Sequence, residues 1–347
     1  MKRVLILIVI AMIAGPMFAE EGILIDFSLL AADIIPIENP RTNGPEFQQH
    51  RQTMMDYAQV AGGSFTTQQK AVMKTSLAIE NWEVTLSSSS RFVENMTLSF
   101  ARESASKLYG KVLGIRVHFP VEPYNAWALI KPPFEIPAYE PAAKVNDDGS
   151  IEPAGDGITG KSRFEAQEAG EPAYGVIKNV GVIKSVAVNV YGLNFPHGLS
   201  TLIIDSQGNE KKMFMGYLQF DGWGELIWNN PAYIQEVRNR DIRLIPLYPT
   251  STPFIKFGGF LVQRDAAKEG GDFVCYFKDV KVIYDLAVLD TERDIEDEGI
   301  WNIIYDRETA RKVFEMERFG HNQVLRYLEQ QKQATEVPFG HPDREQQ

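Results

Sequence analysis

The chain has 347 residues, and its 35 lysines and arginines are outnumbered by 46 aspartates and glutamates, for a net charge of −11. An acidic surface disfavours binding to nucleic acid and to anionic lipid, so we expect neither as a partner. Cys275 is the only cysteine, so the chain can form no internal disulfide. Because it lies in a strand-like apolar run, we interpret Cys275 as a small buried hydrophobe.

The first 19 residues are typical of a secretory signal peptide. A basic start, Met1–Arg3, precedes an apolar run, Val4–Ile13, and Ala19 stands before two glutamates. The run is too short to span a bilayer, which disfavours the alternative of an uncleaved anchor. We therefore expect cleavage after Ala19, export to the periplasm and no membrane insertion. The mature chain (33 basic and 46 acidic residues) would have a net charge of −13.

The first half of the mature chain predicts short strands separated by polar excursions. Residues 29–67 form one such excursion, with a possible short helix around residues 47–57. Alternation of apolar and polar residues is typical of a half-buried strand. Strands are predicted at Ile23–Phe27, Trp82–Ser87, Met96–Phe100, Gly110–Pro120 and Asn125–Lys131.

Residues 132–172 contain six prolines, two Asp-Gly pairs and few apolar side chains. This composition is typical of a long surface loop or a linker. A domain boundary could fall here, but the strands before it are too few to close a core alone. We therefore favour a loop inside one sandwich that covers residues 20–290.

The strand pattern is strongest after this loop. Ser206–Asn209 includes the glycine that a tight hairpin turn requires. Strands are predicted at Val180–Tyr191, Leu199–Asp205, Lys211–Leu218, Gly224–Trp228, Asp241–Leu247, Phe254–Val262 and Asp272–Tyr284. Short strands at regular spacing indicate an all-β, antiparallel jelly-roll sandwich.

The period of apolar residues becomes helical after residue 290. It predicts a C-terminal helical extension at 291–330, and the polar residues 331–347 are predicted to be a disordered tail.

The motifs that carry enzyme chemistry are not found. The five histidines show no zinc-ligand spacing, and the chain has no Gly-x-Ser-x-Gly elbow. A Ser-His-Asp set stays open, because its members need not be close in sequence. The Asn146–Gly149 run fails the calcium-loop pattern, and the carboxylates of Glu292–Glu296 suit a helix N-terminus. We expect no enzyme activity, no catalytic residues, no metal and no cofactor.

Trp223 and Trp228 are the candidates for a binding site, because indole rings can stack on sugars. Trp228 shares a strand face with Leu226, so packing in the core is the simpler interpretation of that ring. Both tryptophans stay candidates for glycan stacking.

Five segments resemble the flagellar filament outer layer (sheath) proteins of spirochaetes. They are Gly181–Val186, Leu202–Gly208, Gly216–Trp223, Trp228–Ile234 and Asp279–Asp285. The resemblance implies a galactose-binding-like jelly roll, export to the periplasm and no catalytic residues. It also implies a coat around a core of flagellin subunits, in contact with neighbouring copies or related sheath proteins.

The resemblance predicts a structural component that influences the stiffness and shape of the periplasmic flagellum in motility. The C-terminal helix and the proline-rich loop are the segments we expect to make subunit contacts, although the helix could equally cap the sandwich's own core. The alternative function is that of an exported carbohydrate-binding module of jelly-roll type.

Overall fold

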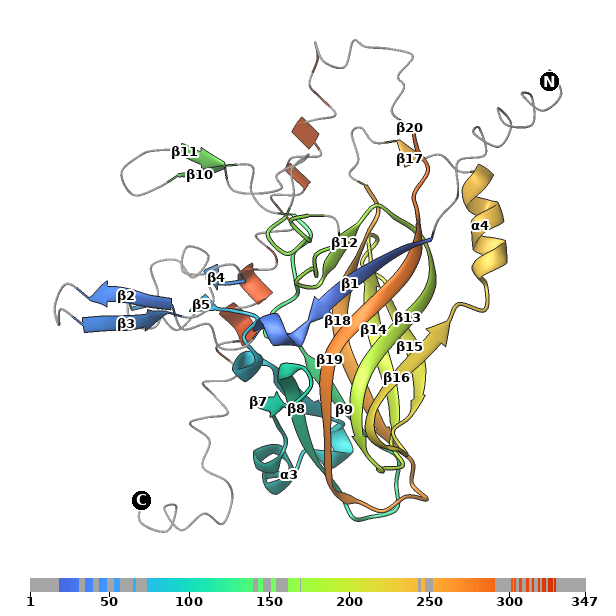
Figure 1. Ribbon diagram of the computed structural model, residues 1–347. Coiled ribbons are helices and arrows are strands. Elements are labelled where there is room, and N and C mark those ends of the chain that lie inside the picture. The colour runs from blue at the N-terminus through green and yellow to red at the C-terminus, as the bar shows by residue number, and fades with distance from the viewer. Residues whose placement is uncertain are drawn as a thin grey trace.

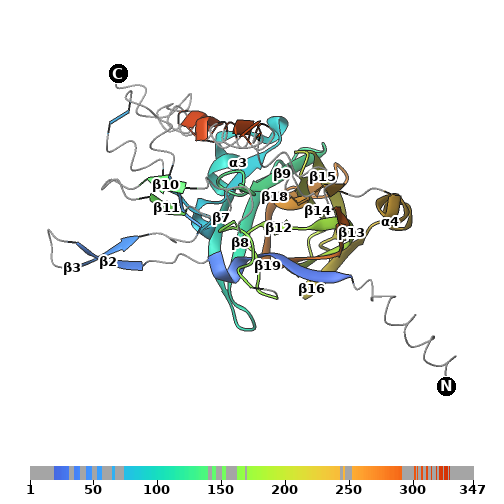
Figure 2. The ribbon, with the colours of Figure 1, turned by 90° about the horizontal axis from the view of Figure 1, so that it is seen from above.

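Two antiparallel sheets packed face to face form the body of the protein in a computed structural model (Figures 1 and 2). The structure describes residues 19–30, 35–39, 44–48, 53–56, 65–66, 74–139, 143–145, 151–153, 162–168, 170–242, 245–246, 252–290 and scattered positions from 301 to 328. The predicted signal peptide, the Asn146–Gly149 run, the Glu292–Glu296 cluster and the tail lie essentially outside these residues.

Sheet I has the order β16-β13-β19-β8-β7, and β1 also pairs with β19. Its strands are β1 (Glu20–Asp26), β7 (Phe100–Ser106), β8 (Gly110–Phe119), β13 (Val180–Leu193), β16 (Asp221–Asn229) and β19 (Gly271–Leu286).

Sheet II has the order β15-β14-β18-β9-β6, and β12 also pairs with β18. Its strands are β6 (Glu83–Leu86), β9 (Ala126–Lys131), β12 (Val176–Lys178), β14 (Gly198–Asp205), β15 (Glu210–Tyr217) and β18 (Phe254–Arg264). Successive strands cross repeatedly between the sheets, as in a jelly roll, which confirms the predicted fold class.

Smaller elements lie outside the two sheets. Among the described residues, scattered positions from 301 to 328 are helical. The other helices are α3 (Val93–Leu98) and α4 (Tyr233–Ile242), with 3-10 turns η1 (Phe27–Leu30), η3 (Ile79–Asn81) and η4 (Ser88–Ser90). Four strand pairs are β2 (Ile35–Asn39) with β3 (Gly44–Gln48), β4 (Met55–Asp56) with β5 (Lys74–Thr75), β10 (Ala143–Val145) with β11 (Ile151–Pro153), and β17 (Ile245–Pro246) with β20 (Leu289–Asp290). Within the described parts of the chain, no helix is long and apolar enough to cross a membrane.

The core between the sheets is dominated by phenylalanine. Phe260 of β18 stacks on Phe277 of β19, with ring centroids 4.1 Å apart and planes 13° apart. Phe27 closes this cluster by edge contacts with Trp82 and Phe257. Cys275 is fully buried in the same core, as predicted, and this burial raises the pKa of its thiol. Aromatic pairs stabilise beyond their buried area, so this cluster holds the sheets together without a disulfide.

Most of the predicted strands are present, and the structure shows which face of each is buried. Leu113, Ile115, Val117 and Phe119 of β8 point into the core, because inward side chains alternate with outward ones. The predicted hairpin after β14 is confirmed, and Gly208 adopts a φ of 83° in its turn.

Three local predictions are wrong. Residues 93–98 form α3 rather than a strand, and the helix α4 extends to Ile242, where a strand was expected from residue 241. Around residues 47–57, the described parts are strands β3 and β4 rather than a helix. Within the predicted loop 132–172, β10 and β11 form a short hairpin.

Candidate functional site

The two candidate tryptophans point to opposite sides of sheet I. In the β13–β16 ladder, Trp228 lies opposite Val186 and Trp223 lies opposite Tyr191. Val186 belongs to the buried core, and Trp228 packs against that core. Because the two residues are an odd number of positions apart on one strand, Trp223 is on the outer face.

Trp223 lies between two tyrosines on the outer face of sheet I. Its ring centroid is 4.9 Å from that of Tyr109 and 5.4 Å from that of Tyr191, and both pairs are T-shaped. Tyr276 extends this aromatic row, with its ring centroid 6.0 Å from that of Tyr191. Tyr109 comes from the turn between β7 and β8, so Trp223 holds this turn against β16. The arrangement is that of a packed cluster, and Trp223 is half-buried within it.

Replacing Trp223 by alanine is expected to destabilise the fold by about 2 kcal/mol, because two aromatic contacts and the anchor of the β7–β8 turn are lost. Urea unfolding measures the free energy, and hydrogen exchange of the turn should rise as well. Ile234→Ala removes a side chain that is 66% exposed in α4 and serves as the control. A change no larger than that of the control would show that Trp223 does not anchor the turn.

A charged cluster lies on the same outer face. Arg116 of β8 donates three hydrogen bonds to Asp272 of β19, and His118 Nδ1 lies 2.9 Å from the same carboxylate. The hydrogen bond with His118, followed by those with Arg116, lowers the pKa of Asp272. Arg116 and Asp272 are opposite charges on neighbouring strands, a pairing that stabilises a sheet, and His118 lies opposite Asp272 in the ladder and makes a hydrogen bond with it.

A second charged group fastens β1 to β19. Lys278 Nζ lies 2.5 Å from Asp26 Oδ2 and 3.5 Å from Asp279 Oδ2. Burial raises the pKa of Asp279, against the opposing effect of Lys278. Asp26 and Asp279 face each other in the ladder, and the single positive charge of Lys278 reduces the repulsion between their carboxylates.

Sheet II carries an outward aromatic row that sequence reasoning did not find. Trp127 of β9 lies opposite Gln263 of β18, Gln263 lies opposite Gly198 of β14, and Gly198 lies opposite Tyr217 of β15. A bulge in β15 after Phe214 turns the rings of Phe214 and Tyr217 to the same face, 5.4 Å apart. The neighbouring inward row belongs to the buried core, so these rings face outward.

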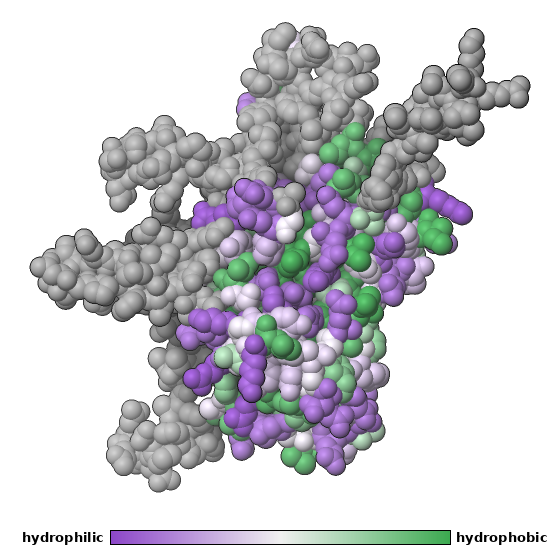
Figure 3. Space-filling model, in the orientation of Figure 1, coloured by the Kyte–Doolittle hydropathy of each residue, from purple (hydrophilic) through white to green (hydrophobic). Residues whose placement is uncertain are grey.

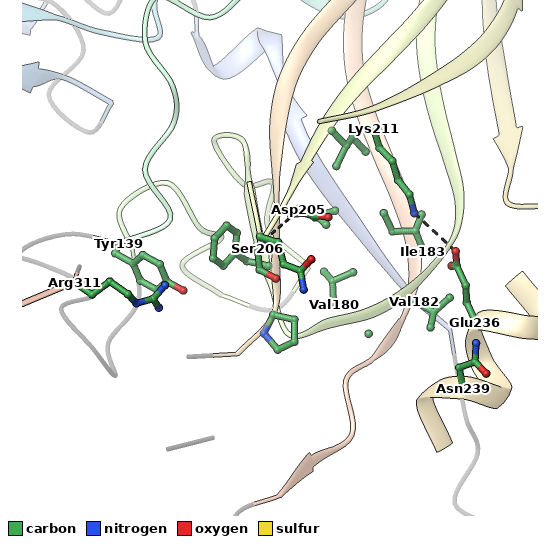
Figure 4. Close-up of a pocket in the computed structure, with 16 residues that line it drawn as sticks. Tyr139, Val180, Val182, Ile183, Asp205, Ser206, Lys211, Glu236, Asn239 and Arg311 are labelled. Atoms are coloured by element: carbon green, nitrogen blue, oxygen red, sulfur yellow. Dashed lines mark hydrogen bonds and ion pairs between the residues drawn. The ribbon is translucent and has the colours of Figure 1, made fainter. Parts of the chain in front are cut away.

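A cavity of about 680 Å³ lies at one end of the sandwich (Figure 4). The start of β13, the turn after β14, helix α4 and residues 253–255 line it, together with Tyr139 and Arg311. Its wall is largely apolar, and Lys211 pairs with Glu236 across it at 3.8 Å.

The carboxylates of this cavity hold local structure. Asp205 accepts hydrogen bonds from the backbone N–H groups of Gln207 and Asn209 in the hairpin turn. Glu236 accepts a hydrogen bond from the side chain of Asn230, which precedes α4. Over the described ranges, no three metal-ligating side chains come together.

Comparison with known proteins decides the family. The family model of flagellar filament outer layer protein Flaa matches residues 46–293. The chain belongs to the flagellar filament outer layer protein family. The match runs from β3 to beyond β20, so both sheets of the sandwich lie largely within the part of the chain that the family model describes.

Members of this family resemble the chain along most of its length. The flagellar filament outer layer protein of Treponema pallidum is 49% identical over 98% of this chain and 96% of its own length. The protein of the same name from Spirochaeta aurantia is 43% identical over 98% and 95%. That of Borreliella burgdorferi is 31% identical over 90% and 84%.

Solved structures similar to this family member include carbohydrate-binding modules. One from the β-sandwich superfamily is 10% identical with a TM-score of 0.29, covering 60% of this chain and 58% of its own. Another, solved with β-1,4-galactotriose, is 8% identical with a TM-score of 0.27, and the match covers 60% of this chain and 90% of that structure's chain. Likeness at this level says nothing about the ligand.

Proposed function

We propose that this protein is a structural subunit of the outer layer of the periplasmic flagellar filament, where it coats a core of flagellin subunits and influences filament stiffness and shape in motility. The observation that carries the proposal is the 49% identity over 98% of the chain to a protein of that name. We expect no enzyme activity in this role. The protein would reach the periplasm through the predicted signal peptide.

The C-terminal helical residues support a role in assembly. Val324 packs against the core of the sandwich, and Arg326 donates hydrogen bonds to Glu83 of β6 and to the carbonyl of Pro133. Trp301 and Phe314, by contrast, are 66% and 67% exposed. Ile303 and Leu325 of the same segment are exposed as well, and apolar side chains that gather on one surface favour a partner that covers it. We propose that this helix contacts neighbouring subunits.

Repeated weak contacts suffice for a layer of this kind. Each copy is held by several neighbours at once, so the effective concentration of every contact is high. The contacts need not close into a ring, because a non-closing contact between unlike surfaces extends along a filament.

Filaments from cells that lack this chain are expected to be thinner and differently curved than those of the parent. Restoring the chain as the double variant Trp301→Ser/Phe314→Ser should leave the filament thin, although the variant folds with stability within about 0.5 kcal/mol of the parent. Electron cryomicroscopy measures the diameter, and thermal unfolding measures the stability.

Leu108→Ser/Val121→Ser provides the matched control, since these side chains are 74% and 77% exposed elsewhere on the molecule. This control should restore the diameter. A helix variant that restores it equally well would exclude the helix from the contacts. Parent-like filaments in cells that lack the chain would refute the proposed function itself.

A further inference from the structure

The outward row of sheet II joins two aromatic groups across four strands. Trp127 at one end is 38% exposed, and at the other end Tyr217 and Phe214 are 53% and 46% exposed. Adjacent strands are about 4.8 Å apart, so three strand spacings place the two ends about 14 Å apart. In Figure 2, these strands form the layer on the far side of the sandwich from β1 and β16.

The surface between the two aromatic groups is recessed at Gly198 of β14. Gly198 has no side chain, and a Cβ built there would lie 3.0 Å from Phe214 Cε2 and 3.7 Å from Tyr217 Cε1. Both rings therefore lean over the backbone of β14. Their planes are 74° apart, so a flat ligand can rest on the face of one ring and touch the edge of the other.

The face is uncharged over both rows that line it. The second row, two residues along each strand, consists of Leu129, Leu261, Ser200 and Phe214. These eight residues carry no charge, and the next outward row begins with Lys131 of β9 and Lys212 of β15, so contacts with the two rows themselves rely on stacking and hydrogen bonds. Sheet I differs, because charged clusters lie beside its aromatic row. On that side of the molecule, polar residues are mixed with scattered apolar ones (Figure 3).

The amide of Gln263 lies between the aromatic ends and can both donate and accept hydrogen bonds. A ligand that fits these two rows needs no charge, presents flat C–H surfaces to the rings at both ends, and carries hydroxyl or amide groups in between. A short saccharide has all three properties. An apolar protein segment would use the rings but not the central amide.

We propose that the outer face of sheet II binds an uncharged oligosaccharide, with Trp127 and Tyr217 stacking on sugar rings and Gln263 bonding to hydroxyl groups between them. The row is an open face rather than an enclosed pocket, so a single saccharide binds weakly. Weak binding becomes effective when the ligand is repeated along a lattice, which favours a saccharide carried by neighbouring filament proteins over a free one. The choice of a saccharide carried by filament proteins rests on the proposed function.

The first experiment uses the purified mature chain and a panel of neutral oligosaccharides of hexoses and N-acetylhexosamines, with binding measured by ligand-observed NMR. Wild type is expected to bind at least one of them with a Kd near the millimolar range. Trp127→Ala, Tyr217→Ala and Gln263→Ala should each weaken that binding about tenfold. Phe92→Ala removes a 57% exposed aromatic side chain from another surface and should change nothing.

The second experiment uses filaments stripped of their outer layer, before and after mild periodate oxidation of sugar diols. Wild type should rebind untreated filaments, and both oxidation and the Trp127→Ala/Tyr217→Ala double variant should reduce rebinding. A double variant that rebinds poorly to filaments on which oxidation has no effect would mean that the face contacts protein, which overturns the saccharide. If neither oxidation nor the double variant reduces rebinding, the saccharide proposal is overturned and the proposed function stands. If wild type does not rebind stripped filaments at all, the result argues against the proposed function.

Discussion

Replacing Arg264 by methionine is expected to lower the free energy of unfolding by about 3–5 kcal/mol, which makes it one of the two largest effects foreseen for this chain. Arg264 ends β18 and is 1% exposed. Its guanidinium donates hydrogen bonds to the carbonyls of Pro120, Glu122 and Lys268, at 2.6, 3.0 and 2.9 Å. These carbonyls belong to two loops at one end of the sandwich, so methionine would remove the cation that joins the loops. The carbonyls of Pro120 and Lys268 would lose their donor, whereas that of Glu122 would keep the N–H of Tyr124.

Urea unfolding followed by circular dichroism measures this effect. Arg264→Lys should also destabilise, because an ammonium group lacks the planar fork that reaches three carbonyls. Arg116→Met is the control: this arginine pairs with Asp272, the two side chains are 36% and 51% exposed, and its loss should cost less than about 1 kcal/mol. If Arg264→Met unfolds like this control, the loops are held together by other contacts.

The positions of the strands could be predicted because apolar and polar residues alternate in a strand that is buried on one side only. β8 and β13 show it over most of their length. α4 was missed although its start carries a helix signal: Asn230 accepts a hydrogen bond from the N–H of Ala232 and donates one to Glu236. The spacing of apolar residues did not predict α3, because Phe92, Val93 and Met96, which lie beside or within the helix, are all exposed.

The outward row of sheet II could not be predicted, because the alternation of β9 does not say which face is buried. Ala126 and Ala128 are 3% and 0% exposed, whereas Trp127 faces solvent. Both alanines belong to the same buried core as the phenylalanine stack of β18 and β19. A single sequence shows only that Trp127 and the alanines lie on opposite faces. For Trp228 the face shared with Leu226 indicated the correct side, because both side chains pack against the core.

His197 is the second residue for which a large effect is expected. It is 4% exposed at the end of the core, where its ring stacks on Phe119 and lies 4.7 Å from that of Phe273. Among the described residues, neither ring nitrogen has a hydrogen-bond partner. Burial, together with the nearby charge of Arg264, lowers the pKa of His197 to about 4. The folded protein therefore holds this ring neutral.

This shift makes the fold sensitive to acid. The unfolded chain protonates His197 near pH 6.5, whereas the folded protein does so near pH 4. Because the unfolded state binds the proton more readily, the stability that His197 contributes is present above pH 6.5 and is lost as the pH falls towards 4. A difference of about 2.5 pKa units corresponds to about 3 kcal/mol.

Changing His197 to phenylalanine should therefore remove about 3 kcal/mol of the stability that wild type loses between pH 7 and pH 4. The comparison uses the change with pH rather than the stability at one pH, so any packing cost of the larger ring cancels. His118→Gln is the matched control, because His118 lies on the outer face beside Asp272 and its loss should preserve the steep acid dependence. Equal pH dependence in wild type and His197→Phe would mean that the buried ring does not control acid unfolding. The expected result instead places the acid sensitivity of the folded chain in its core, at His197.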